Sequence, residues 1–421
     1  MTPATNQGFY GLGIAPKLLD TLDKLHFTVP TPIQEKSIPI AIEGNDIIGV
    51  AQTGTGKTLA FGIPMLQRLA ISKGVGLIVL PTRELAIQVD EALHGIGTGI
   101  GLRTAVLIGG ASMNMQVNAI RRDPHVIVAT PGRLLDHLEQ KTIGLSKVAI
   151  LVLDEADRML DMGFAPQIRR ILAVVPKDRQ TMLFSATMPA DIVKIAQQHM
   201  KLPLQVEVAP SGTAAERVEH ELYVVPSPSK NRLLETVLGN YHGTVLVFTR
   251  TKHGAKKLTR FVKHLGNTAA EIHSNRSLAQ RRDALEGFKK GAYRVLIATD
   301  IAARGIDVTG IELVINYDLP STAEDYIHRI GRTGRAGLAG KAISFAMPDQ
   351  RSDVFAIERL LKMRLPVTRL PELPPDRVVP MPKYDDDRGV RSFRGGGRPP
   401  RSGGGRPSFG GGRGGQQRRY R

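Results

Sequence analysis

The chain has 421 residues, enough for two or three domains, and its 42% hydrophobic content is ordinary for a protein with full cores. It contains no cysteine, which excludes disulfides, thiolate zinc ligands and cysteine nucleophiles, and no apolar run reaches the roughly 20 residues of a membrane span. The formal net charge of +18 indicates a polyanionic partner.

Residues 1–35 are predicted to form a polar leader with one helix, from Pro16 to Leu25, followed by a proline-framed segment that ends at Gln34. The first seven residues lack the charged and apolar regions of a secretory signal. Together with the absence of cysteine, this favours a cytoplasmic protein that has no membrane partner.

Residues 36–209 alternate short apolar runs with helical patterns. The expected strands are 46–50, 76–80, 104–108, 126–129, 148–153 and 181–184. Short apolar runs of this kind are typical of strands in a parallel sheet that is covered on both faces. Their alternation with helices predicts a doubly wound α/β domain.

A phosphate-binding loop is predicted directly after the first of these strands, with a helix following from about residue 59. The segment comprises Ala51, Gln52, Thr53, Gly54, Thr55, Gly56, Lys57 and Thr58. Its glycines let backbone N–H groups turn toward phosphate oxygens, its lysine reaches the outer phosphates, and its last threonine ligates Mg²⁺. The general pattern opens with glycine, and that position is Ala51 here. The alternative is a flexible turn.

Two carboxylates, Asp154 and Glu155, follow the apolar strand at 148–153. In open α/β sheets, ligands bind at the carboxyl ends of the strands. Paired with the phosphate loop, Asp154 is predicted to hold Mg²⁺ together with Thr58, and Glu155 to polarise an attacking water. The predicted chemistry is nucleotide hydrolysis, which is phosphoryl transfer to water. Taken alone, the same acidic run would be a solvated turn.

A small, polar linker is predicted at 210–217, and a second alternating domain at 218–372. Its expected strands are 219–225, 244–249, 268–272, 294–299, 311–316 and 341–346, and a helix at about 350–362 closes it. This half of the sequence has no phosphate loop of its own.

The last segment, residues 373–421, is rich first in proline and then in arginine and glycine. It is predicted to be disordered because it cannot bury a core. Ten arginines, and no acid or lysine, lie after residue 387. Two interpretations remain open: an arm that binds RNA phosphates while its few aromatic rings stack on bases, or a solubilising tail.

Over about residues 1–370, the ordered motifs resemble those of DEAD-box ATP-dependent RNA helicases, in the RhlE-like bacterial subfamily. The resemblance implies two tandem RecA-like doubly wound domains that use ATP and Mg²⁺ and bind RNA. Phe9 and the segment ending at Gln34 resemble the adenine-reading Q motif of that family. In this motif, Gln34 would pair with the adenine edge and Phe27 would cover its face.

The resemblance also implies site residues in both halves of the chain. Those expected to contact RNA are Arg83, Gly110, Thr130, Arg133, Arg281, Thr299 and Arg304. Those expected to couple the two domains are Asp157, Ser185, Thr187 and His328, with the two hydroxyls placed to hydrogen-bond the Asp157 carboxylate. Arg332 and Arg335 would be arginine fingers that act with Lys57, Asp154 and Glu155, and Asp307 would face the ribose. One departure is Leu278, at a position where many relatives have glutamine.

The predicted activity is RNA-stimulated ATP hydrolysis coupled to local, non-processive unwinding of short RNA duplexes and remodelling of RNA–protein complexes. The main alternative is an RNA annealer or ATP-gated scaffold dominated by the basic tail, and a DNA translocase with the same paired domains is another. The expected partners are single-stranded and short duplex RNA, bound mainly through the backbone, with ribosome-assembly or RNA-decay proteins as further ones. We expect a monomer.

Overall fold

The computed structural model describes residues 8–52, 54–208, 218–300, 311–334 and 340–375. The predicted linker and the arginine-rich segment lie outside these ranges, as do Thr53, Arg304, Asp307 and Arg335. Among the helices within these ranges, none is long and apolar enough to cross a membrane.

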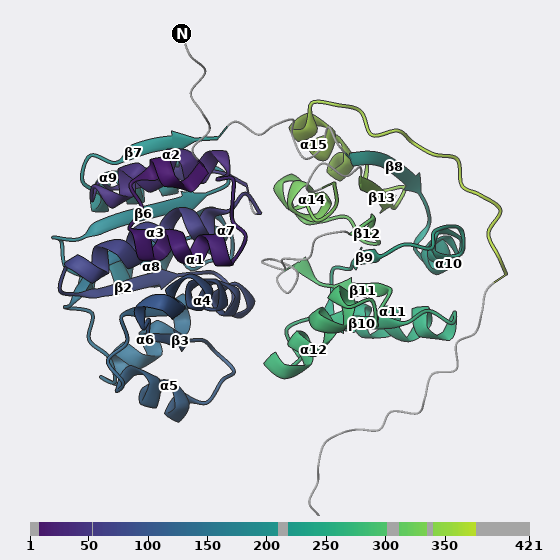
Figure 1. The fold of residues 1–421 in the computed structure, drawn as a ribbon. Helices are drawn as coiled ribbons and strands as arrows, with labels where there is room; N and C mark the ends of the chain where they lie inside the picture. The colour runs from purple at the N-terminus through teal and green to yellow at the C-terminus, as the bar shows by residue number, and fades with distance from the viewer. Residues whose placement is uncertain (1–7, 53, 209–217, 301–310, 335–339, 376–421) are drawn as a thin grey trace, which may run out of the picture. The chain divides into compact units, whose positions relative to one another are not determined.

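The first domain is built on a seven-stranded parallel sheet (Figure 1). In spatial order its strands are β3 (Thr104–Leu107), β4 (Val126–Ala129), β2 (Val75–Val79), β5 (Val148–Leu153), β6 (Gln180–Ser185), β1 (Ile47–Val50) and β7 (Leu204–Glu207). The six strands predicted from apolar runs are confirmed to within one residue of their expected bounds. The sequence does not predict β7, because this edge strand alternates apolar and polar residues and exposes most of them.

Helices cover both faces of this sheet, as the doubly wound pattern predicts. They are η1 (Gly8–Leu12), α1 (Pro16–Lys24), α2 (Pro32–Ile42), α3 (Lys57–Ile71), α4 (Arg83–Gly97), η2 (Thr98–Ile100), α5 (Met113–Ile120), α6 (Pro131–Glu139), α7 (Ala156–Asp161), α8 (Ala165–Val174) and α9 (Ala190–His199). Neighbouring residues of a strand enter different cores: Ile47 packs with residues of α1 to α4, and Ile48 with residues of α6 to α9. This alternation is the two-residue period of a strand.

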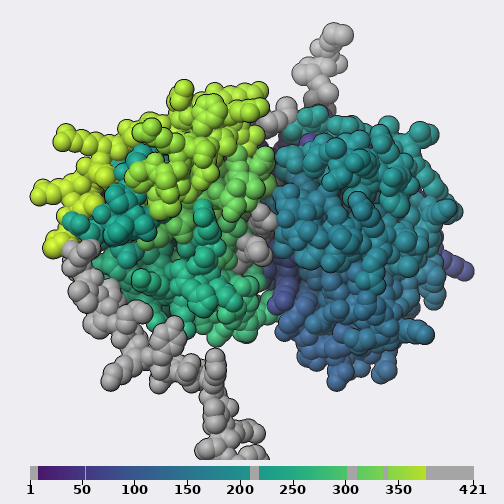
Figure 2. All heavy atoms as spheres, turned by 180° about the vertical axis from the view of Figure 1, so that it is seen from behind, coloured from purple at the N-terminus to yellow at the C-terminus, as the bar shows by residue number. Residues whose placement is uncertain are grey.

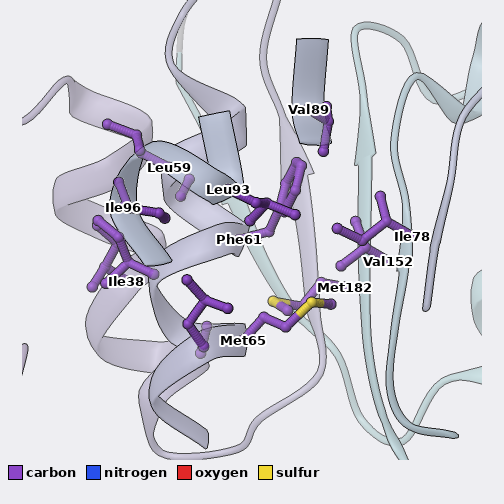
Figure 3. Packing of buried hydrophobic residues seen from close by; sticks show 14 of the residues in the cluster. Ile38, Leu59, Phe61, Met65, Ile78, Val89, Leu93, Ile96, Val152 and Met182 are labelled. Atoms are coloured by element: carbon purple, nitrogen blue, oxygen red, sulfur yellow. The ribbon is translucent and has the colours of Figure 1, made fainter. Parts of the chain in front are cut away.

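The core between α3, α4 and the sheet is drawn in Figure 3. Phe61 and Met65 of α3 and Leu93 of α4 pack toward Ile78 of β2 and Met182 of β6. All five side chains are fully excluded from solvent. Burying a side chain of this size stabilises a fold by about 1.5–3 kcal/mol. This layer therefore holds α3, and with it the loop that precedes α3, in one place.

The second domain has a six-stranded parallel sheet. In spatial order its strands are β10 (Ala269–Ile272), β11 (Val295–Ala298), β9 (Val245–Phe248), β12 (Leu313–Asn316), β13 (Gly340–Ala346) and β8 (Val218–Val224). Its helices are η3 (Ser227–Ser229), α10 (Lys230–Asn240), α11 (Lys252–His264), α12 (Leu278–Lys289), α14 (Ala323–Ile330) and α15 (Arg351–Leu361). All six predicted strands and the closing helix are confirmed to within two residues.

Side chains cover the central strands that Figure 1 draws as arrows, and the space-filling view shows the surface that encloses them (Figure 2). The central strands β4, β6, β9 and β11 are buried along their whole length. A ligand therefore meets the loops at the strand ends rather than the sheets themselves.

Candidate nucleotide site and RNA-facing loops

Three predicted motifs follow three adjacent strands of the first sheet: β5, β6 and β1. Because these strands are parallel, their carboxyl ends lie at the same edge of the sheet. The acidic motif begins at Asp154 after β5, the Ser-Ala-Thr segment begins at Ser185 in β6, and the phosphate loop follows β1. The structure thus brings together motifs that lie far apart in the sequence.

The phosphate loop turns tightly into the N-terminus of α3. Gly54 and Gly56 have φ angles of 86° and 90°, a left-handed conformation that glycine adopts without strain. A side chain at position 56 would also collide with the Gln34 amide. Since α3 begins at Lys57, its free N–H groups and the positive end of its dipole face the loop, as an anion site requires.

Two further hydrogen bonds fix the loop, one to the end of a strand and one within the loop. The Ala51 N–H donates to the Ser185 carbonyl at 2.9 Å, which joins the loop to the end of β6. Thr55 Oγ1 donates to the Gln52 carbonyl at 2.7 Å. Thr58 lies one residue inside α3, next to the loop, and is half-buried.

Lys57 is held by the acidic motif. Its Nζ lies 2.8 Å from Glu155 Oε1 and 3.8 Å from Asp154 Oδ1. Arg158 Nε lies 3.1 Å from the second Glu155 oxygen. All four side chains are buried, so two cations balance two carboxylates inside the protein. Reasoning from the sequence missed Arg158, although its position three residues after Glu155, on one helix face, is a signal that could have found it.

Burial shapes the charge states of this cluster. It raises the pKa of Asp154 to about 6, although the Lys57 ammonium opposes the shift. Burial disfavours the charged form of Lys57 as well, but Glu155 and Asp154 outweigh burial and raise the pKa of Lys57. Glu155 has a φ of 54°, a left-handed conformation that costs a non-glycine residue about 1–3 kcal/mol. Backbone strain of this kind clusters at functional sites.

Asp157 joins the acidic motif to the segment after β6. Its Oδ2 accepts hydrogen bonds from Thr187 N at 2.8 Å, from Thr187 Oγ1 at 2.9 Å and from Ala186 N at 3.1 Å. Ser185 Oγ instead accepts from the Asp157 backbone N–H at 3.2 Å. Because α9 begins only at Ala190, these hydroxyls do not cap that helix.

Gln34 lies in the first turn of α2, and its amide spans two segments. Its Oε1 accepts from Thr31 N at 2.9 Å, and its Nε2 donates to the Gly56 carbonyl at 3.0 Å. An amide has two lone pairs and two N–H groups, so one of each remains, which complements adenine N6–H and N7.

The two aromatic residues predicted to contact the nucleotide, Phe27 and Phe9, differ in their exposure to solvent. Phe27 is 40% exposed and is accessible to a ligand. Phe9 is only 3% exposed and belongs to the hydrophobic core between the helices and the sheet. Phe9 therefore packs in the core, where it supports the leader, and a direct nucleotide contact by this ring stays a prediction from the sequence.

Four residues predicted to contact RNA lie at the carboxyl ends of the neighbouring strands β2, β4 and β3. Arg83 begins α4, and its guanidinium packs on Gly110 so closely that a side chain there would collide with it. Gly110 also has a φ of 79°, a conformation that glycine adopts without strain. Arg133 Nη1 donates to the carbonyl of the residue after Gly110 at 3.1 Å. Thr130 is the residue that precedes α6. Two arginines and a glycine turn therefore share one edge.

In the second domain, Arg329 of α14 is built into the core. It is 2% exposed, pairs with Asp300 at 2.6 and 2.8 Å, and donates to the Asp318 carbonyl at 2.6 Å. Its guanidinium also lies 4.9 Å from the centroid of the Phe248 ring. The Asp318 carboxylate accepts hydrogen bonds from Lys230, Thr249 and Arg250. This network ties α14 to the ends of β9, β11 and β12.

The other predicted residues of the second domain lie on loops and helix ends. Thr299 follows β11, and Arg281 lies in the first turn of α12, which begins at Leu278. His328 and Arg332 lie at the end of α14, where Arg332 Nε donates to the His328 carbonyl at 3.3 Å. Arg304, Asp307 and Arg335 lie outside the described residues.

A divalent metal fits the residues present. Mg²⁺ is usually held by one or two carboxylates together with substrate phosphates rather than by a closed protein cage. Asp154 and Thr58 supply a carboxylate and a hydroxyl from the loops after β5 and β1. Within the described part of the chain, no group of three or more His, Cys, Asp or Glu could hold a metal by itself. Phosphate oxygens and water would therefore complete the shell.

Comparison with known proteins covers both domains. The family profile of the DEAD/DEAH box helicases matches residues 31–195, and that of the helicase conserved C-terminal domain matches residues 229–337. The chain is 43% identical to the ATP-dependent rRNA helicase RRP3 of Meyerozyma guilliermondii, over 85% of this chain and 76% of that protein. It is 45% identical to RRP3 of Yarrowia lipolytica, over 80% and 71%.

Solved structures of related helicases support the same family assignment. The fold resembles S. cerevisiae Dbp5 bound to RNA and ADP BeF3, with a TM-score of 0.75, 32% identity, and coverage of 86% of this chain and 96% of that one. It also resembles Mss116p bound to ssRNA and AMP-PNP, with a TM-score of 0.78, 26% identity, and coverage of 87% and 80%. Likeness in sequence and fold over at least four fifths of the chain goes beyond a shared motif. The chain therefore belongs to the DEAD-box family of ATP-dependent RNA helicases.

Proposed function

We propose that this RNA helicase separates short RNA duplexes locally, without processive movement, and remodels RNA–protein complexes, with the residues named above in the roles that follow. The observation that carries the catalytic part is the buried contact of Lys57 Nζ with Glu155 Oε1, at 2.8 Å. It joins the phosphate loop directly to the acidic motif.

Lys57 is the residue that has to change partner when ATP binds. Its ammonium now neutralises Glu155 and Asp154. The triphosphate brings its own negative charge to the loop, so the ammonium turns to the outer phosphates. Glu155 keeps its contact with Arg158 and can then orient a water and accept its proton. Bound Mg²⁺, held by Asp154 and Thr58, would supply charge neutralisation on the phosphates.

Asp157 is proposed to couple the nucleotide to the domains. Three hydrogen bonds from residues 186 and 187 converge on one of its oxygens, so a shift of the acidic motif moves that segment as well. We assign the same coupling role to Ser185 and to His328 in the second domain. Arg332 and Arg335 would reach the γ-phosphate when the domains close, and Asp307 would reach the ribose.

RNA would be gripped through its backbone by the arginines and glycine turn at the first sheet edge and by loop residues of the second domain. The set comprises Arg83, Gly110, Thr130, Arg133, Arg281, Thr299 and Arg304. If ATP and RNA both favour the closed state, each tightens the binding of the other by the same factor.

The relatives are named rRNA helicases, and we propose ribosomal RNA and ribosome-assembly proteins as partners of this chain. The RhlE-like bacterial subfamily, a cytoplasmic location, a monomeric state and the domain bounds at 36–209 and 218–372 stay predictions from the sequence.

Steady-state ATP hydrolysis, with single-stranded RNA and with DNA of the same sequence, tests the coupling. Strong stimulation by RNA alone is expected, because discrimination against DNA has to come through 2′-hydroxyls. Hydrolysis that does not respond to RNA would contradict closure of the domains around both ligands.

Gln34→Ala is expected to weaken ATP binding by about 10–100-fold, the loss of roughly two hydrogen bonds, while GTP binding stays nearly unchanged. The reason is that Gln34 keeps one lone pair and one N–H that match adenine. Equilibrium binding of both nucleotides measures the effect. If ATP and GTP lose affinity equally, Gln34 acts only on the phosphate loop through its bond to Gly56.

Affinity for Mg·ATP is expected to be flat above about pH 6 and to fall by up to tenfold per pH unit below it. The raised pKa of Asp154, about 6, means that a proton increasingly occupies the carboxylate as the pH drops through that value. Binding of a non-hydrolysable analogue between about pH 5 and pH 8 measures this. The Asp154→Asn variant experiences the same titration of the nucleotide. Parallel losses in both proteins would therefore contradict the role of Asp154.

A further inference from the structure

One helix of the second domain carries an exposed basic face that none of the roles above uses. α11 bears five Lys or Arg side chains, two histidines and no acid; its basic residues are Lys252, His253, Lys256, Lys257, Arg260, Lys263 and His264. All seven side chains are exposed. At about 100° per residue they fall on a single arc of roughly 140°.

The opposite face of α11 is occupied by the core of its own domain. Ala255, Leu258, Phe261 and Val262 are buried there. A basic amphipathic helix can bind a membrane surface when its apolar face is available for insertion. Here that face is not available, so only the cations remain to meet a partner.

These cations are not neutralised by neighbouring acids. Two exposed cations on other helices do pair locally: Lys194 with Asp191 on α9, and Lys290 with Glu286 at the end of α12. Lys256, Lys257, Arg260 and Lys263 make no such pair with any residue that the structure describes. Like charges three or four residues apart repel one another along a helix. A polyanion that lies along the face would relieve this repulsion.

The position of α11 identifies the polyanion. The helix starts two residues after Arg250, at the edge where the predicted RNA loops of this domain end. Its first residue, Lys252, donates to Asn275 in the loop after β10 at 3.1 Å. From that edge its 13 residues run for about 20 Å along the flank of the domain. An RNA strand that leaves the loops therefore meets a row of cations.

We propose that the basic face of α11 is an additional RNA-binding surface, which holds the phosphate backbone flanking the segment gripped by the loops. The inference rests on the proposed RNA path through the second domain. Its effect is on affinity for long RNA, not on the chemistry of ATP.

The test compares two charge-matched triple variants of the full chain. K256Q/R260Q/K263Q removes the centre of the basic face, and glutamine is a good helix former, so the fold is kept. K147Q/R169Q/K177Q removes two lysines and one arginine from exposed sites on the first domain, where Lys147 and Lys177 lie at or near the amino ends of strands, away from the loops. Binding is measured against salt concentration for a long single-stranded RNA and for a short strand that spans only the loops.

For the α11 variant, affinity for the long RNA is expected to fall roughly 5–50-fold near physiological salt, and the slope of log affinity against log salt to become shallower by about 2. Affinity for the short strand and the ATPase rate at saturating RNA should not change. The control variant should match the unmodified protein throughout.

If both variants lose RNA affinity equally, the effect is one of net charge and the proposal is overturned. An equal loss of affinity for the short and the long RNA in the α11 variant would overturn it as well. Polyglutamate serves as a protein-like polyanion: if the α11 variant loses binding to it but not to RNA, the face serves an acidic protein. Absence of RNA-stimulated hydrolysis in the unmodified protein would count against the proposed function alone, because the difference in affinity between the two variants is measured without turnover.

Discussion

Glu155→Gln is expected to lower ATP turnover by about 10²–10⁴-fold while ATP and RNA binding stay within a few-fold of the unmodified protein. The amide has the size of the carboxylate but keeps only one acceptor oxygen, whereas Lys57 and Arg158 lie 2.8 and 3.1 Å from two different Glu155 oxygens. That one oxygen can serve Arg158 once Lys57 has turned to the phosphates of bound ATP. The amide cannot take a proton from water, so only the chemical step is lost. Single-turnover hydrolysis, combined with equilibrium binding of ATP and RNA, measures the effect.

Two outcomes would contradict this role for Glu155. Hydrolysis at the unmodified rate would mean that another group, or no group, accepts the proton. A loss of ATP affinity as large as the loss of turnover would mean that Glu155 acts by holding Lys57 and the phosphate loop in place. The strained φ of 54° at this residue is kept in the variant, so the comparison isolates the carboxylate.

Arg332→Gln is expected to lower the rate of hydrolysis by about 10³–10⁵-fold, the range that arginine fingers supply. Nucleotide binding to the first domain should persist, because the guanidinium would act on charge that develops only in the transition state. RNA-stimulated turnover and binding of an ATP analogue measure the two effects separately.

Arg329 provides the matched control, because it lies on the same helix end, three residues before Arg332. Arg329→Gln breaks a buried bidentate pair with Asp300 and should lower the free energy of unfolding by about 3–5 kcal/mol. Arg332 is 2% exposed as well, but its hydrogen bond to the His328 carbonyl is 3.3 Å long, so Arg332→Gln should lower the free energy of unfolding by less than Arg329→Gln. If both variants unfold equally early, Arg332 is a structural residue and the assignment as a finger is wrong.

The strands of both sheets could be predicted because a strand that is buried on both faces appears in the sequence as a short run of apolar residues. β5 and β9 are unbroken apolar runs, and every residue but one in them is buried. β7 leaves no such mark: at the edge of the sheet it needs only Val206 inside. The phosphate loop and the acidic motif could be predicted as well, because their residue types and spacing are tied to phosphate chemistry.

Whether a single side chain is buried or accessible depends on residues that are distant in the sequence. From the sequence, Phe9 could equally be a ligand contact or a core residue, and only the packing of the helices around it places it in the core. From the sequence, Arg329 resembles a surface charge, and only the fold brings Asp300 from another segment to pair with it. Arg158 is buried because the fold closes over its contact with Glu155, three residues earlier. The sequence by itself thus determined the two doubly wound domains, the nucleotide chemistry and the basic charge, because these depend on local pattern and composition. Only the tertiary structure decided which charges are paired and buried and which, as on α11, stay exposed, because that depends on neighbours distant in the chain.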